Sequence, residues 1–139
     1  MFDWLTLPLV ALVAVAIQFG GMTFFAFMFA PLTFKFLPRE QAAEFQRKLF
    51  PIYDRTNAAL AVVPALCLAN HEEAGVELTT MLVVALTFII AARYLLPAVE
   101  RARVAGETAR FSSLHHISVM LHMVQWLAIG FVLIRLYVA

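Results

Sequence analysis

The sequence is poor in cysteine, the residue on which many small extracellular domains and metal centres depend. Its single cysteine, Cys67, lies inside an apolar stretch. One cysteine cannot form an intramolecular disulfide, and a metal site built from several thiolates is excluded. A free cysteine in such a stretch is most often a small packed hydrophobe, so we assign no chemistry to Cys67.

Charged residues are also scarce. Asp, Glu, Lys and Arg make up 14% of the 139 residues, and the formal net charge is +1. A chain with so little charge offers no basic face for nucleic acid, so no nucleic-acid partner is expected. The sequence also lacks a phosphate-binding glycine loop, a nucleophile elbow and a paired carboxylate motif. We therefore assign no enzymatic activity, although these absences do not exclude one.

Apolar residues, in contrast, make up 63% of the chain. A soluble domain of this length could not bury so many of them. They are arranged in blocks of about 20 residues, which is long enough to cross a lipid bilayer. We predict an all-α integral membrane protein, a single domain over residues 1–139 with a bundle of four transmembrane helices. The four predicted spans are residues 5–30, 52–70, 78–97 and 113–136.

The connection between the first two blocks has the pattern of an amphipathic helix. Apolar residues recur there at near-helical spacing from Leu37 to Leu49, and charged residues fall between them. Glu44 and Lys48 are four residues apart, in the order that favours an ion pair on a helix. We predict a separate amphipathic helix between the first and second transmembrane helices, lying on the cytoplasmic surface of the membrane.

Basic residues are distributed unevenly among the connections. The first and third connections hold almost all of them, namely Lys35, Arg39, Arg47, Lys48 and Arg55, and Arg93, Arg101, Arg103 and Arg110. Because connections rich in Lys and Arg stay in the cytoplasm, we predict that both termini lie on the outer, periplasmic side. The short connections favour a bacterial inner-membrane protein. Arg135 is the exception, and we expect its side chain to extend to the membrane interface.

The last block, residues 113–136, carries a line of polar side chains on one helical face. On a helix that turns 100° per residue, its members fall within an arc of about 80°. The line consists of His115, Ser118, His122 and Gln125. Polar groups inside a membrane need partners, so this face is the first place to look for a site.

Other polar groups are predicted to reach the level of this line. The second block begins with Asp54 and Arg55, and the third ends near Arg93. The topology places all three at the cytoplasmic edge of the bundle, where we expect them to meet His115. Gln18, at mid-depth of the first block, is a further candidate. Such a cluster serves either as a ligand site or as a structural network, and the sequence leaves both open.

The histidines raise the question of haem b. A haem held by two histidines needs them on opposite sides of its plane, usually on two helices. Here His115, His116 and His122 share one helix. A five-coordinate haem, or ligands from two protomers, would still fit, so haem binding remains an alternative. His115 and His122 are two turns apart, too far to share one metal ion, so the metal content stays unknown.

Small residues predict where helices come close together. Ala16 and Gly20 in the first block, and Ala58, Ala61 and Ala65 in the second, are spaced for close packing. Four helices in a lipid bilayer leave little room for a transport pathway. We therefore expect a homo-oligomer that packs through the alanine stripe of the second block.

Four short motifs follow one another over most of the chain. They are Gly20-Gly21-x-x-Phe24-Phe25 with Pro31, Leu37-Pro38-Arg39-Glu40, Leu49-Phe50-Pro51-x-Tyr53 and Leu114-His115-x-x-Ser118. Together they resemble the transmembrane-protein-205-like family, usually classed as being of unknown function. The resemblance implies a four-helix membrane domain. That family commonly has an amide side chain where this chain has His122, so the resemblance favours His115 as the shared position.

Three functional hypotheses follow. A eukaryotic relative within the resembled family is associated with resistance to platinum drugs, which implies export or handling of small or metal-bearing solutes. We therefore favour transport or handling of such a solute through a polar site at the cytoplasmic end of the bundle. The alternatives are a haem-binding or redox membrane protein and a structural or accessory membrane subunit.

Overall fold

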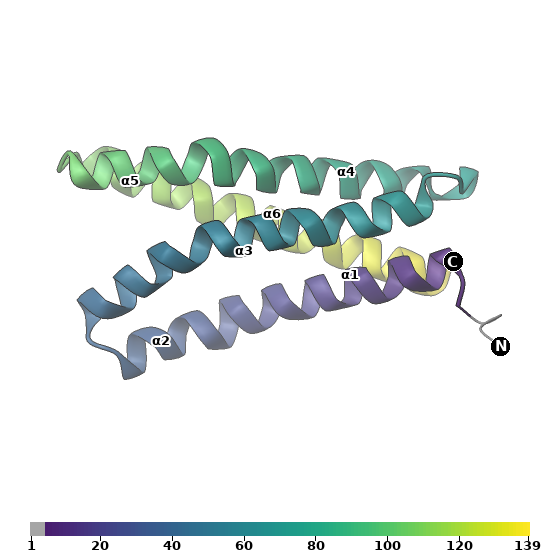
Figure 1. The fold of residues 1–139 in the computed structure, drawn as a ribbon, viewed down its shortest axis with the longest axis horizontal. Helices are drawn as coiled ribbons and strands as arrows, with labels where there is room; N and C mark the ends of the chain where they lie inside the picture. The colour runs from purple at the N-terminus through teal and green to yellow at the C-terminus, as the bar shows by residue number, and fades with distance from the viewer. Residues whose placement is uncertain (1–4) are drawn as a thin grey trace.

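The computed structural model describes residues 5–139, which fold into helices joined by short turns (Figure 1). Several of these helical segments follow one another without a turn between them, and we call each such continuous helix a rod. In chain order the segments are α1 Leu7–Phe24, η1 Phe25–Phe29, α2 Ala30–Phe36, α3 Arg39–Leu68, η2 Glu72–Ala74, α4 Gly75–Ile90, η3 Ala91–Leu95, α5 Leu96–Val104 and α6 Thr108–Val138. The chain thus forms four long rods: α1–α2, α3, α4–α5 and α6.

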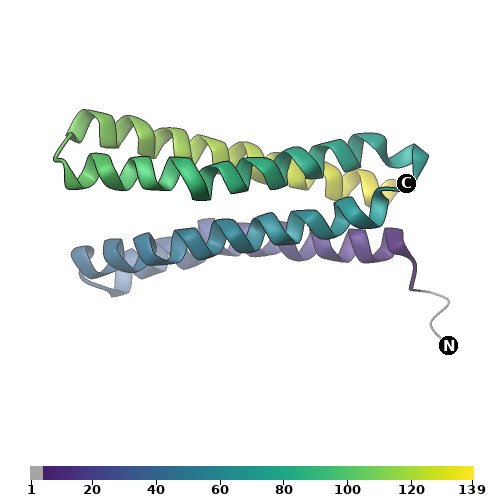
Figure 2. The same cartoon turned by 45° about the horizontal axis from the view of Figure 1, so that its top comes forward.

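Each rod runs antiparallel to the one before it (Figures 1 and 2). The rod α3 packs against α1 and α4, and α6 packs against α1, α4 and α5, so the four rods close into a ring. The α2–α3 and α5–α6 turns lie together at one end of the bundle, which we call the α2–α3 end. The start of α1, the α3–α4 turn and the end of α6 lie at the opposite, α3–α4 end. This is the up-and-down arrangement of many four-helix bundles.

Three of the rods are long and apolar enough to cross a membrane, namely Leu7–Phe36, Glu72–Val104 and Thr108–Val138. They agree with the first, third and fourth predicted spans but extend beyond them, all three at the α2–α3 end and Glu72–Val104 also by six residues at the α3–α4 end. The remaining rod, α3, does not meet the same requirement, because its first half is charged. The stretch of α3 after Arg55 is shorter than the ~20 residues that a span needs. The second predicted span therefore stays a prediction.

The prediction of a separate amphipathic helix before the second span is wrong. Leu37, which precedes a proline, is extended with φ −106° and ψ 149°, and α3 then runs without a break from Arg39 to Leu68. The physical reason lies on its inner face, where Ala42 is fully buried and Gln46 is 5% exposed against the rest of the bundle. The amphipathic pattern thus reflects one face packed on the neighbouring rods and one face turned outward.

Two π-helical turns, η1 and η3, each come just before a proline. The backbone N–H of Ala30 donates to the carbonyl of Phe25, and that of Leu96 donates to the carbonyl of Ala91. A proline ring clashes with the carbonyl four residues earlier, and a widened turn relieves that clash. Pro31 and Pro97 therefore continue their rods instead of ending them. The two halves of the chain share this device.

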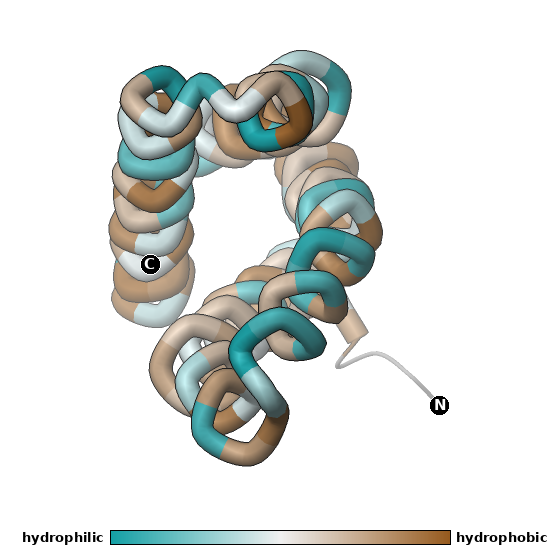
Figure 3. The backbone as a smooth tube through the Cα atoms, turned by 90° about the vertical axis from the view of Figure 1, so that its left-hand side faces the viewer, coloured by the Kyte–Doolittle hydropathy of each residue, from teal (hydrophilic) through white to brown (hydrophobic). Residues whose placement is uncertain are grey.

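The surface of the bundle is apolar on the outside, and hydrophilic residues gather towards the α2–α3 end, which faces the viewer in Figure 3. The stripe Ala58, Ala61 and Ala65 is buried inside the chain's own bundle, with 7%, 0% and 3% exposure. The expectation that this stripe joins two copies of the chain is therefore wrong. Gly20 is also not a contact point, since a Cβ atom added there would meet nothing within 4 Å.

Candidate functional site

A histidine and an aspartate from two rods meet in the interior of the bundle. Asp54 of α3 and His122 of α6 are joined by 2.8 Å between Oδ1 and Nε2. The Asp54 side chain is fully buried, and the His122 side chain is 16% exposed. The second carboxylate oxygen of Asp54, Oδ2, is buried and has no hydrogen-bond partner in the described chain. The pair therefore holds one free acceptor.

Hydrogen bonds define how protons are held in this pair. Nδ1 of His122 lies 2.7 Å from the backbone carbonyl oxygen of Ser118. A carbonyl oxygen can only accept, so Nδ1 carries a proton. A second proton between Nε2 and Asp54 gives either an imidazolium beside a carboxylate or two neutral groups. The pair can thus gain or release this proton without rearranging its other bond.

Aromatic rings surround His122. The ring centroids of Phe50, Tyr53 and Phe88 lie 6.0, 5.8 and 5.9 Å from that of the imidazole. Phe25 of the first π-helical turn stacks on Tyr53 at 4.4 Å. These rings lower the local dielectric constant around the pair, which strengthens its electrostatic interactions and raises the cost of leaving either member unpaired.

A layer of amide side chains lies one turn from the pair, towards the α3–α4 end. Gln18 of α1 donates through Nε2 to the backbone carbonyl oxygen of Asn57 at 2.9 Å. Gln125 of α6 donates through Nε2 to Oγ1 of Thr87 at 2.9 Å. The two glutamines are almost completely buried, at 1% and 2% exposure. One bond joins α1 to α3 and the other joins α6 to α4, so all four rods contribute to the layer.

Several residues of the predicted cluster lie elsewhere. His115 is exposed and stacks on Phe111 at 6.0 Å between ring centroids. Arg55 and Arg93 are exposed as well. The expectation that His115 meets Asp54 is corrected, because His122 occupies that place.

The cause is helical geometry. Seven residues separate His115 from His122, which is about 10 Å along a helix axis. The rods α3 and α6 bring Asp54 beside the deeper histidine. Arg55 follows Asp54 directly, and adjacent residues on a helix point about 100° apart, so the two cannot share the inner face.

Some inward-facing polar residues were not among the predicted site residues. Trp126 donates through Nε1 to Oγ1 of Thr23 at 2.8 Å, which joins α6 to α1. Asn57 and Thr87 complete the amide layer. A signal for them exists in the sequence, since Asn57 stands one helical turn after Asp54, and Thr87 is the single polar residue in the middle of its apolar block.

A second ion pair closes the α3–α4 end of the bundle. Arg135 of α6 donates through Nε to Oε1 of Glu77 at 2.5 Å, and its guanidinium lies 5.6 Å from the ring centroid of Phe131. Glu77 is buried, at 4% exposure. The arginine that departed from the charge pattern is therefore paired within the bundle, and its neutralisation by Glu77 explains why it is tolerated there.

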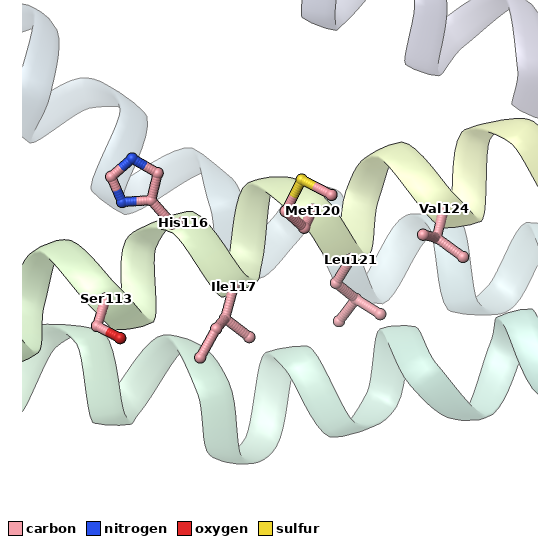
Figure 4. A pocket seen from close by; sticks show the side chains of 6 residues that line it. All are labelled: Ser113, His116, Ile117, Met120, Leu121 and Val124. Carbon is pink, nitrogen blue, oxygen red and sulfur yellow. The ribbon is translucent and has the colours of Figure 1, made fainter.

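The outer side of α6 carries a shallow groove lined by Ser113, His116, Ile117, Met120, Leu121 and Val124. His116 and Met120 point to one side of the helix, and Ile117 and Leu121 point to the other (Figure 4). Nδ1 of His116 bonds to the backbone carbonyl of Ser112 at 2.6 Å, so this histidine is tied to its own helix. The groove does not include the buried pair.

A metal ion held by three or more protein ligands, or a haem held by two histidines of one chain, would need more ligands than these residues provide. Within residues 5–139, no group of three or more His, Cys, Asp or Glu side chains lies close enough to hold a metal ion. Of the histidines on α6, His122 alone pairs with another rod, and its Nε2 is already bonded to Asp54. The geometry offers no pair of facing histidines to the haem alternative.

The profile of a domain of unknown function, DUF4149, matches residues 13–108. That is more than half of the chain. The chain belongs to the DUF4149 family. Searches of curated proteins and of solved structures gave no match. The DUF4149 match includes Asp54 and ends at the first residue of α6, before His122. It provides no evidence for the transmembrane-protein-205-like family, and its description assigns no activity.

Proposed function

We propose that this protein is a multi-pass membrane protein that transports or otherwise handles a small cationic solute at the His122–Asp54 pair. The observation that carries the proposal is a fully buried carboxylate, paired with one imidazole and retaining one free oxygen, between rods with apolar outer faces. Ionisable groups at such depth are costly to bury and mark ion pathways, proton relays or ligand sites.

The charge of the pair indicates how a cation would be handled. An imidazolium beside a carboxylate is neutral overall. When the proton leaves, one negative charge remains on Asp54, and a monovalent cation at its free Oδ2 restores neutrality. Exchange of a proton for a cation therefore avoids an uncompensated charge in the low-dielectric interior. His122 holds or releases the proton, and Asp54 binds the solute.

The class of solute and the orientation are part of the proposal. The resemblance to the transmembrane-protein-205-like family supports a metal-bearing cation. The basic residues at the α2–α3 end support a cytoplasmic location for that end, with both termini periplasmic in a bacterial inner membrane. On this assignment the pair lies inside the bundle, deeper from the cytoplasm than His115.

The test uses cisplatin as the probe, because replacement of one of its chloride ligands by water gives a platinum complex with a single positive charge. A bacterial host expresses the wild-type chain or a variant, and cellular platinum is measured by mass spectrometry after exposure. We expect wild-type cells to contain less platinum than cells with an empty vector. Asp54→Asn and His122→Gln should abolish this difference, because each removes the exchangeable charge. His116→Gln is the matched control, since it changes a histidine on the outer side of the same helix.

The platinum content of cells with each variant decides whether the His122–Asp54 pair is the site. Platinum lowered equally by wild type, Asp54→Asn and His122→Gln would remove the pair from the proposed site. Membrane content of each variant is measured in the same cells, so that loss of protein is not mistaken for loss of activity.

A second candidate is a structural or accessory subunit. The bonds Gln18–Asn57, Gln125–Thr87 and Trp126–Thr23 each join two rods, which is what a purely structural network would do. Under this candidate, Asp54→Asn should lower stability or partner binding, and the platinum content should not depend on the wild-type chain.

A further inference from the structure

Gln46 is buried in an unusual way. It lies on the inner face of α3 with 5% exposure, and neither its Nε2 nor its Oε1 has a hydrogen-bond partner among the described residues. Oδ2 of Asp54 is in the same condition on the same rod. Eight residues separate the two side chains, which is about 12 Å along the helix and slightly more than two turns.

Buried polar atoms in stable proteins are almost always bonded, to protein or to ordered water. The amide of Gln46 and the free oxygen of Asp54 are too far apart to share one water, so they offer hydrogen bonds to the two ends of a line of several waters. Ser118 of α6, which is 8% exposed, stands one turn before His122 on the side of the α5–α6 turn. Polar groups from two rods thus lie between the α2–α3 end and the pair.

Towards the α3–α4 end, the interior of the bundle changes from polar to apolar. The Oε1 atoms of Gln18 and Gln125 also lack partners among the described residues, so unpaired polar atoms continue from Gln46 as far as the amide layer. The remaining buried atoms without a partner, Oε2 of Glu77 and Nδ1 of His71, lie at the α3–α4 end itself. Beyond that layer the buried residues are apolar until Glu77. They include Ala61, Leu68, Met81, Ile129 and Val132, each with at most 1% exposure. These apolar side chains offer no polar partners to a chain of water along the bundle axis. A cavity of about 240 Å³ beside the amide layer opens instead between α4 and α6, on the outer face where Thr79, Val83 and Val124 are exposed.

We propose that ordered water fills the interior from Gln46 to the amide layer, and that it connects the His122–Asp54 pair with solution at the α2–α3 end alone. The amide of Gln46 offers a donor and an acceptor to this water, and Asp54 Oδ2 offers a further acceptor. Protons and a small polar cation would reach the pair through this entrance. The inference deepens the proposed function by assigning one-sided access to its site.

Cysteine accessibility tests the water path directly, and the single native cysteine makes the design simple. In a Cys67→Ser background, Gln46→Cys and Ala61→Cys are each treated with a charged methanethiosulfonate in membrane vesicles of either orientation. Both positions are buried on the same face of α3, at 5% and 0% exposure, so burial alone predicts equal protection. We expect Gln46→Cys to react about tenfold faster or more, because the reactive thiolate needs water.

The reaction should also depend on orientation, occurring when the reagent is on the side of the α2–α3 end. Equal rates at positions 46 and 61, or equal rates from both sides, would overturn the inference. No solute is required in this experiment. The platinum measurement can therefore fail while the accessibility result stands, and the reverse also holds.

A second measurement guards against disturbance by the cysteines. Deuterium exchange of the His122 ring protons is followed by nuclear magnetic resonance in protein with labelled histidine. Gln46→Leu should slow this exchange by about tenfold or more, because it removes both polar groups that hold the entrance water. Gln41→Leu, an identical change at an exposed position of the same helix, should leave it unchanged. Unaltered exchange in Gln46→Leu would count against the proposal.

Discussion

The two halves of the bundle interior are built from the same four rods but differ in chemistry. Towards the α3–α4 end, the buried residues are apolar and closely packed, and they end at the Glu77–Arg135 pair. Towards the α2–α3 end, the interior itself holds Gln46, Asp54 and His122, and both Gln46 and Asp54 have polar atoms without a partner among the described residues. In the other half, the unpaired polar atoms belong to Glu77 and His71, at the end of the bundle. The outer faces of both halves are rich in exposed apolar side chains. The two halves therefore differ inside the bundle as well as in the hydrophilic residues that gather at the α2–α3 end (Figure 3).

This difference separates the apolar half, which stabilises the fold, from the half that holds the buried ionisable side chains. Apolar packing alone would hold the rods together, as it does in the α3–α4 half. Burying a carboxylate and an imidazole in the other half lowers stability relative to apolar residues of similar size. A feature that costs stability and leaves polar atoms free is where function is expected. The predictions below probe this division, beginning with the largest effect.

The largest effect is expected from breaking the His122–Asp54 pair. His122→Leu leaves the Asp54 carboxylate buried and uncompensated, and loss of one partner of such a pair costs about 3–5 kcal/mol. Asp54→Leu is expected to cost a similar amount. The double variant should recover most of this loss, because two apolar side chains can pack where the charges were. The measurement is a double-variant cycle on the free energy of unfolding in detergent micelles.

The double-variant cycle can also contradict the proposed difference between the two halves of the bundle. If the double variant is as unstable as the sum of the single variants, the pair does not interact in the folded protein. If both single variants are as stable as the wild type, the α2–α3 half does not carry the electrostatic cost assigned to it. His116→Leu, on the outer side of α6, is the matched control and should change little.

The sequence predicts the rods better than it predicts the site. Hydropathy locates three membrane-length rods, because a long apolar run has few alternatives to a helix. It places the boundaries less well, since α3 continues through Pro51 and α1 continues into α2 through a π-helical turn. These extensions depend on packing against other rods, which a local pattern does not contain.

The site shows the same limit. The predicted polar line on the last helix includes Ser118, His122 and Gln125, which the structure places towards the interior, and the predicted acid Asp54 is buried beside them. That these residues form a functional site stays a prediction. The choice of His115 as the partner of Asp54 was wrong because it required the depth at which α3 and α6 meet. That depth is set by the packing of all four rods, and a shift of two turns exchanges one histidine for the other.

An intermediate effect is expected at Gly130, where α6 comes close to Phe19 of α1. A Cβ atom added there would lie 2.8 Å from Cε2 of Phe19, whose ring stacks on Trp126 at 5.3 Å. Gly130→Leu should therefore lower the free energy of unfolding by about 1–3 kcal/mol, the usual cost of overpacking. Gly20→Leu, at an open position of α1, should be neutral or slightly stabilising because leucine favours a helix more than glycine does.

Equal effects of the two glycine variants would show that the rods do not approach closely at Gly130. The α3–α4 half would then not be closely packed at this point. The proposal that water reaches the His122–Asp54 pair from the α2–α3 end alone would be weakened. Thermal unfolding in detergent, with both variants prepared side by side, is sufficient for this measurement.

The smallest effect is expected from charges outside the bundle. Lys48 donates a hydrogen bond to Glu44 at 2.8 Å and, with its charge, lowers the pKa of that carboxyl below its ordinary 4.5. A lowered folded-state pKa adds stability above the unfolded pKa, and this stability is lost as the pH falls through the folded value.

Lys48→Met should therefore lower the unfolding temperature only slightly at pH 7, and the difference from wild type should vanish at a pH well below 4.5. Salt should reduce it as well, because both side chains are exposed and screened. The His122–Asp54 cycle should respond less to salt than the Lys48–Glu44 pair does, since its side chains are buried or nearly so. A large, salt-insensitive effect of Lys48→Met would mean that outer charges, and not the interior alone, distinguish the two halves.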